Sequence, residues 1–145
     1  MTSPSYHDTQ AGTEIAPRQY QVTRRDLVKY AGASGDFNVI HWNERIAKSV
    51  GLPDVIAHGM LTMALAGRYL TEWAGDPGAV TEFGVRFSSP VVVPDDDKGA
   101  MVEIAGAVTG KLDGHQVTVE ITARSGDAKV LTRAHAVVRL ATAPA

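Results

Sequence analysis

Hydrophobic and polar residues alternate through most of the second half of the chain. In the stretch EFGVRF, every second position from Phe83 to Phe87 is hydrophobic, which is typical of a half-buried strand. Three further runs have the composition of strands: MVEIAGAVTG (101–110), HQVTVEITAR (115–124) and KVLTRAHAVVRL (129–140). The joints Asp113-Gly114 and 125–127 (SGD) are hairpin signals. This half of the chain is therefore predicted to form an antiparallel meander.

The first half has the periodicity of helices. From Gly59 the segment GMLTMALAGRYLTEWAG is apolar around most of its circumference, which is typical of a helix enclosed by other structure. Two shorter helices are expected over 24–32, closed by Gly32, and over 44–50, with an extended segment ending at 20–22 before them. This order predicts an α+β fold in which an antiparallel sheet wraps one long central helix.

Composition places the chain among ordinary globular proteins. A single domain over 1–145 is expected, because 44% of the residues are hydrophobic and 21% charged. Residues 1–11 and 142–145 are expected to be frayed tails. A net charge of -2 and a pI of about 6.2 weigh against nucleic-acid binding.

The same composition narrows the expected location of the protein. Cysteine is absent, which excludes disulfides and thiolate chemistry. The N-terminus lacks the apolar core of a secretory signal. The longest apolar tract, Met60 to Trp73, is interrupted by charges and shorter than the ~20 residues that a membrane span requires. We therefore expect a cytoplasmic protein without a membrane span.

The stretch ASGDFNVIHW (33–42) places Asp36 and His41 five residues apart. That separation corresponds to about 140° around a helix and to opposite faces of a strand, so only a shaped loop brings the two side chains together. Glycine, serine and asparagine in the stretch favour such a loop. The alternative is a structural one, a turn aspartate followed by a packed histidine.

A second unusual stretch, AHGM (57–60), places Gly59 at the start of the buried helix. Free N–H groups at a helix N-terminus attract an anion or a developing oxyanion, and glycine lets a ligand approach the backbone. A simple N-cap is the alternative interpretation of Gly59.

The five histidines show no close pairing of the zinc-protease kind, and we expect neither a metal site nor a cofactor.

Together these residues resemble a known signature. Tyr30-Ala-Gly-Ala-Ser-Gly-Asp36-x-Asn38-x-x-His41 with Ala57-His58-Gly59-Met60-Leu61 is similar to the hydratase 2 motif of the MaoC-like (R)-specific enoyl thioester hydratases and dehydratases. The stretches RRDLVKYAG, IHWNERIAKSVGL, IAHGMLTM and GDPGAVTEFGVRF look like the B subunits of mycobacterial-type (3R)-hydroxyacyl-ACP dehydratases. One departure is Val39, where the family usually has proline.

The resemblance implies a hot-dog fold and reversible dehydration of (3R)-3-hydroxyacyl thioesters to trans-2-enoyl thioesters, in fatty acid or related chain elongation. Under it, His41 is the principal base toward C2, and Asp36 orients His41 and handles the hydroxyl or water. The two roles could also be exchanged. The Gly59 N–H would serve the thioester oxygen, and Met60 and Asn38 join it in substrate binding.

The expected partners are an acyl-CoA or acyl-ACP substrate and a second hot-dog subunit, in a homodimer or a heterodimer. Four basic residues could meet an acidic carrier or simply form a solvated helix face: Arg18, Arg24, Arg25 and Lys29.

Two other functions remain open. A hot-dog thioesterase would use Asp36 to activate water, and a non-catalytic subunit would only bind the acyl thioester. The paired His41 argues against the first, and the complete motif argues against the second.

Overall fold

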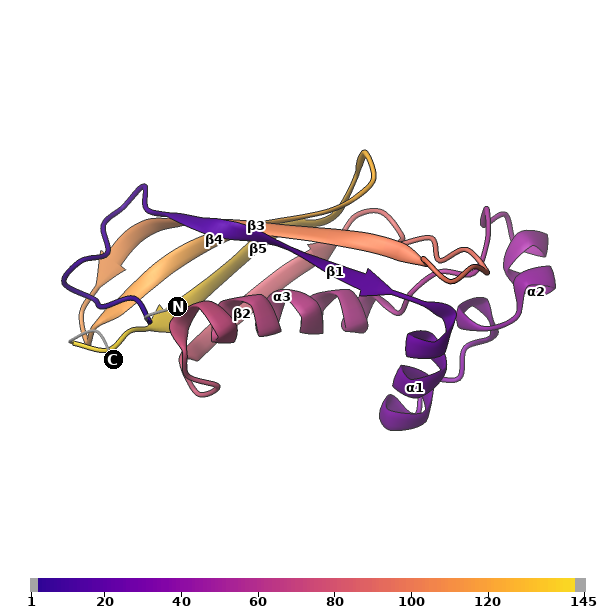
Figure 1. The fold of residues 1–145 in the computed structure, drawn as a ribbon, viewed down its shortest axis with the longest axis horizontal. Helices are drawn as coiled ribbons and strands as arrows, with labels where there is room; N and C mark the ends of the chain where they lie inside the picture. Colours follow the sequence, from indigo (N-terminus) through magenta and orange to yellow (C-terminus); the bar gives the residue numbers. More distant parts are fainter. Residues whose placement is uncertain (1–2, 143–145) are drawn as a thin grey trace.

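A computed structural model describes residues 3–142, in which five strands form one antiparallel sheet. The strands are β1 (Glu14–Val22), β2 (Val80–Phe87), β3 (Ala100–Leu112), β4 (Gln116–Ser125) and β5 (Ala128–Arg139). Their spatial order is β1-β3-β4-β5-β2, so β1 and β2 are the edge strands (Figure 1). The predicted meander is confirmed as β3-β4-β5, and the earlier extended segment joins the sheet as β1.

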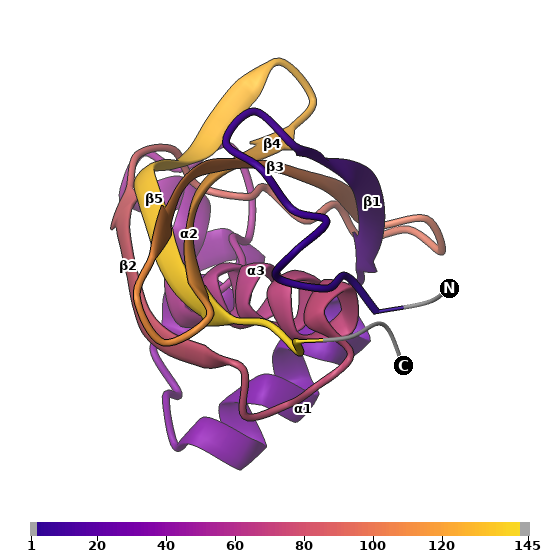
Figure 2. The same cartoon turned by 90° about the vertical axis from the view of Figure 1, so that its left-hand side faces the viewer.

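The long helix α3 (Gly59–Ala74) lies along the concave face of the sheet, which curves around it (Figure 2). Buried side chains of α3 such as Ala66 and Leu70 belong to the same core as Ile104, Val119 and Val138 from the sheet. Alternate residues of β3 and β4 face this core, while the residues between them face outward. The α+β arrangement expected from the sequence is therefore confirmed. No helix in the described part of the chain is long and apolar enough to cross a membrane.

The remaining helices gather at the end of the sheet where α3 begins (Figure 1). They are α1 (Arg24–Ser34), the 3₁₀ helix η1 (Val39–His41) and α2 (Glu44–Ser49). A capping box between Thr23 and Asp26 starts α1, as the sequence predicts. The prediction that Gly32 closes this helix is wrong, because α1 runs on to Ser34 and ends at Gly35, whose backbone is left-handed (φ 76°).

The N-terminal segment corrects a second expectation. Residues 1, 2 and 143–145 lie outside the described residues, but Ser5 and Thr9 are buried rather than frayed. Ser5 forms a parallel bridge with Ala141, and the Tyr6 N–H donates to the Ala141 carbonyl at 2.8 Å. The Tyr6 hydroxyl also donates to the Leu112 carbonyl at 2.9 Å. These contacts with the end of β3 and the residues after β5 give the polar segment a fixed place that its composition alone did not predict.

Candidate active site

The stretch around Asp36 and His41 is a loop shaped by its own side chains. Asp36 Oδ1 accepts the N–H of Asn38 at 3.1 Å, and Asn38 Oδ1 accepts the N–H of Ile40 at 3.3 Å, which caps η1. The indole N–H of Trp42 closes the loop by donating to the Phe37 carbonyl at 3.0 Å. Short polar side chains that bind nearby backbone give the chain an alternative to regular structure, which explains the loop.

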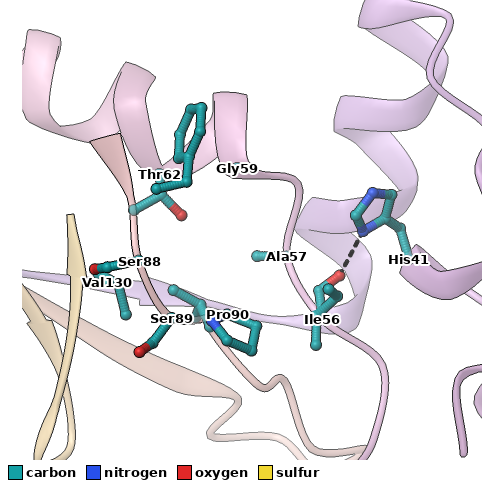
Figure 3. A pocket seen from close by; sticks show the side chains of 11 residues that line it. His41, Ile56, Ala57, Gly59, Thr62, Ser88, Ser89, Pro90 and Val130 are labelled. Atoms are coloured by element: carbon teal, nitrogen blue, oxygen red, sulfur yellow. Dashed lines mark hydrogen bonds between the residues drawn. The ribbon is translucent and has the colours of Figure 1, made fainter. Parts of the chain in front are cut away.

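His41 is fixed by a backbone carbonyl. Its Nδ1 lies 2.7 Å from the carbonyl oxygen of Ile56 (Figure 3). A carbonyl only accepts, so Nδ1 carries the proton and Nε2 keeps its lone pair. Nε2 in turn lies 4.0 Å from Oδ2 of Asp36. The loop therefore brings the two side chains near each other, but 4.0 Å exceeds a direct hydrogen bond. The hydrogen-bond partner of His41 is Ile56, whereas the family resemblance implied that Asp36 orients the ring.

The two groups differ in their surroundings. His41 is buried, whereas half of the Asp36 side chain is exposed. Burial is the largest effect on His41 and lowers its pKa below the ordinary 6.5 of histidine. The hydrogen bond to Ile56 and the Asp36 carboxylate oppose this shift, and the neighbouring His58 adds to it. The site thus pairs an accessible carboxylate with a shielded imidazole that resists protonation.

His58 is the site residue that sequence reasoning missed. Its ring is stacked on that of His41, with centroids 3.8 Å apart and planes 24° apart. The two histidines are seventeen positions apart in sequence, so no local spacing predicts their contact; the AHGM stretch was the available signal. The side chains of Asp36, His41 and His58 bring together oxygen and nitrogen atoms that could bind a metal ion. A metal bound through both imidazoles would lie in both ring planes, which near-parallel stacked rings do not allow.

An open pocket of about 220 Å³ lies beside His41 (Figure 3). Gly59 and Thr62 of α3 form one wall, and the segment from Phe87 to Val91 forms another. The Phe87 ring lies over Gly59, where an added Cβ would come within 3.1 Å of it. The absence of a side chain at Gly59 therefore keeps the start of α3 accessible beneath this ring.

The first amides of α3 have no intrahelical partners, as at the start of any α-helix. The carbonyl of His58 accepts the N–H of Leu61 at 3.0 Å and that of Thr62 at 3.3 Å. Among the described residues, the amides of Gly59 and Met60 make no hydrogen bond, as expected for the first turn of a helix. Gly59 lines the pocket; Met60 and Asn38 do not. Their expected part in substrate binding stays a prediction, and the structure gives Asn38 a capping role.

The family model of the MaoC like domain matches residues 8–126. The chain belongs to this family. A solved MaoC-like dehydratase superimposes with a TM-score of 0.91 at 43% identity, over 96% of this chain and 43% of that chain. The unliganded R-hydratase PhaJ1 from Pseudomonas aeruginosa, 23% identical over 99% of this chain and 90% of its own, superimposes with a TM-score of 0.86. These likenesses confirm the expected hot-dog fold.

Two curated relatives carry names for related reactions. The chain is 42% identical over 74 residues to 3-hydroxyacyl-thioester dehydratase X of Mycobacterium tuberculosis, covering 51% of this chain and 25% of that protein. It is 32% identical over 91 residues to the (R)-specific enoyl-CoA hydratase of Rhodospirillum rubrum, covering 62% of each. The chain thus spans only a quarter of the first relative and less than two thirds of the second.

The lowered pKa of His41 predicts the pH dependence of any reaction that needs it as a base. Below the folded-state pKa the imidazole is protonated and cannot accept a proton, so activity should fall as pH decreases through a value under 6.5. Because the unfolded chain takes up this proton at higher pH, the same group should also destabilise the fold as pH falls from 6.5. The acid limb of kcat/KM measures the first effect; a limb at or above 6.5 would contradict it.

Proposed function

We propose that the protein catalyses the reversible dehydration of (3R)-3-hydroxyacyl thioesters to trans-2-enoyl thioesters. The observation that supports this most is the 4.0 Å separation between the free Nε2 of His41 and Oδ2 of Asp36. Two acceptors at that distance can both lie within hydrogen-bonding range of one oxygen atom placed between them. The 3-hydroxyl of the substrate can donate its single proton to Asp36 at this position, and the water of the reverse reaction can donate one proton to each group.

The proposed elimination uses one proton shuttle. His41 Nε2 removes the C2 proton, and the electron pair of that C–H bond forms the C2–C3 double bond as the C3–O bond breaks. The imidazolium returns the proton to the departing hydroxide, so that water leaves and His41 is again neutral. Asp36 accepts a hydrogen bond from the hydroxyl and stabilises the transient imidazolium across the 4.0 Å gap. Hydration is the same sequence reversed.

Negative charge on the thioester oxygen requires donors during this step. Gly59 lines the pocket at the N-terminus of α3, where its unpaired amide and the helix dipole would favour negative charge. The ring of His41 lines the same pocket. A thioester whose oxygen meets Gly59 would therefore present its C2 and C3 atoms toward the dyad.

The geometry favours this reaction over thioester hydrolysis. A thioesterase needs its base beside a water at the carbonyl carbon, whereas here the gap between His41 and Asp36 suits the oxygen at C3. Both groups of the motif are present and lie 4.0 Å apart, which also weighs against a subunit that only binds acyl thioesters. The assays separate the cases: hydration lowers the ultraviolet absorbance of an enoyl thioester, and hydrolysis releases free thiol.

The carrier of the acyl group is proposed to be CoA or an acyl carrier protein. Of the four basic residues considered for carrier contact, two already serve the fold. Arg24 donates to the Val93 carbonyl at 2.6 Å and to Asp54 at 2.7 Å, and Arg18 pairs with Glu72. Arg25 and Lys29 are exposed on α1 and are the ones left to meet an acidic carrier.

We propose that the working unit is a dimer with a second hot-dog subunit. Large hydrophobic side chains near the site are half or more exposed in the single chain: Phe37, Trp42, Met60 and Phe87. A hydrophobic surface of this kind marks an interaction site. A structural neighbour at 22% identity is the ChsH1-ChsH2 complex of M. tuberculosis, in which two different chains assemble. A copy of this chain or a related subunit could cover the surface.

Asp36→Asn and His41→Ala should each remove most hydratase activity while leaving the fold intact. Losing a positioned proton-transfer group costs roughly 10²- to 10⁴-fold in rate, and neither side chain belongs to the hydrophobic core. Turnover of a crotonyl-type thioester and circular dichroism measure the two effects. Near-normal turnover in both folded variants would refute the dyad.

Gly59→Val should lower turnover strongly with a modest loss of stability. The new Cβ would come within 3.1 Å of the Phe87 ring and occupy the approach to the amide, and the loss of one oxyanion donor costs roughly 10²- to 10³-fold. Gly59→Ala and Gly67→Ala form a matched pair, because each adds one methyl group to the same helix. The Cβ at Gly67 would lie 3.5 Å from Phe83, an ordinary contact, so this variant is the control. Parental turnover in Gly59→Val, or an equal loss in Gly67→Ala, would place the oxyanion site elsewhere.

Sedimentation at low protein concentration tests the dimer. A dimer would cover the exposed aromatic and methionine side chains, so the active species should stay dimeric. It would be a homodimer, or a heterodimer formed after addition of a partner subunit copurified with the protein. Phe37→Ser should weaken the assembly, because this side chain is 63% exposed and outside the core of the single chain. A fully active monomer would contradict the proposal.

A further inference from the structure

We infer that His58 is a positioning residue that holds the Asp36 backbone against the ring of His41. The inference rests on the proposed function of these two groups. His58 stands at the N-cap of α3 and is 1% exposed, so it cannot itself reach solvent, and it does not line the pocket. Its effect on the reaction would therefore pass through its neighbours.

The bond from His58 to the catalytic loop is specific. Nε2 lies 3.0 Å from the carbonyl oxygen of Asp36. Since a carbonyl only accepts, Nε2 carries the proton and donates. Within the described chain, every other hydrogen bond of residues 36–38 comes from residues 34–42. Within the described chain, His58 is thus the hydrogen-bond link between residues 36–38 and the start of α3.

The ring of His58 packs against two other rings. It stacks on His41 at 3.8 Å and lies 4.8 Å from the ring of Tyr30 in α1. One rigid side chain therefore contacts the imidazole of the dyad and the backbone that carries the carboxylate. A shift of His58 would change the 4.0 Å gap in which the hydroxyl is proposed to bind.

The unpaired nitrogen of His58 argues against a role in packing alone. Nδ1 is buried and, within residues 3–142, has no hydrogen-bond partner. A buried polar atom without a partner is costly, and a hydrophobic side chain of similar size would avoid that cost. The bond donated by Nε2 and the flat ring against His41 give histidine an advantage that a leucine would lack.

Three substitutions test the inference. The amide of glutamine can place a donor near the position of Nε2, whereas that of asparagine is too short and leucine has none. We expect His58→Leu and His58→Asn to lower kcat by roughly 10²-fold with little change in KM, because a displacement of about 1 Å costs that much. His58→Gln should remain within a few-fold of the parent.

Tyr69→Phe is the matched control. It removes another buried hydrogen bond of α3, from the Tyr69 hydroxyl to the Ile15 carbonyl at 2.9 Å, away from the pocket. Thermal stability should fall while kcat stays at the parental value. Folded His58→Leu with parental kcat, or His58→Gln as impaired as His58→Leu, would overturn the inference. If His58→Leu does not fold, the comparison of glutamine with asparagine decides.

Amide NMR signals of residues 36–38 give a readout that does not depend on turnover. They should move in His58→Leu and His58→Asn and stay near the parental positions in His58→Gln. Unchanged signals in His58→Leu would overturn the inference. If the parent has no hydratase activity but the signals move as expected, the placement of the loop by His58 stands and the proposed reaction falls.

Discussion

The hydrogen bond from His41 Nδ1 to the Ile56 carbonyl is the contact on which the site depends. Ile56 also donates its own N–H to the Ile40 carbonyl at 3.2 Å, so the segment before α3 and the loop after α1 are joined twice. The same segment is anchored by the bridge between Ile56 and Val92. The Ala57 N–H donates to the Val91 carbonyl at 2.8 Å, and the Val55 carbonyl accepts the Val93 N–H at 2.9 Å. The orientation of one imidazole is thereby tied to a rigid part of the fold.

This arrangement determines which ring nitrogen of His41 carries the proton. With its proton held on Nδ1, His41 has one free basic atom, and burial keeps that atom unprotonated to lower pH. Asp36 stays half exposed on a loop braced by its own side chains and by His58. The buried His41 and the half-exposed Asp36 thus lie 4.0 Å apart in different surroundings, as the proposed division of roles requires.

Much of the fold was predictable because its signals are local. The alternation in β3 to β5 and the apolar α3 follow directly from side-chain periodicity, and the loop between Asp36 and His41 follows from their awkward spacing. The contact of His41 with Ile56 and with His58 was not predictable, since it arises only when segments distant in sequence pack together. The same reason explains the N-terminal segment, where Ser5 and Tyr6 find partners near the other end of the chain.

The ring tautomer of His41 tests the account most directly, because the proposed chemistry requires a free Nε2. Nitrogen-15 NMR of the imidazole near neutral pH distinguishes the two forms without any substrate. The structure predicts a protonated Nδ1 and an unprotonated Nε2, given the carbonyl acceptor 2.7 Å from Nδ1. A proton on Nε2 at that pH would contradict the account, because His41 could then not accept the C2 proton from the pocket side.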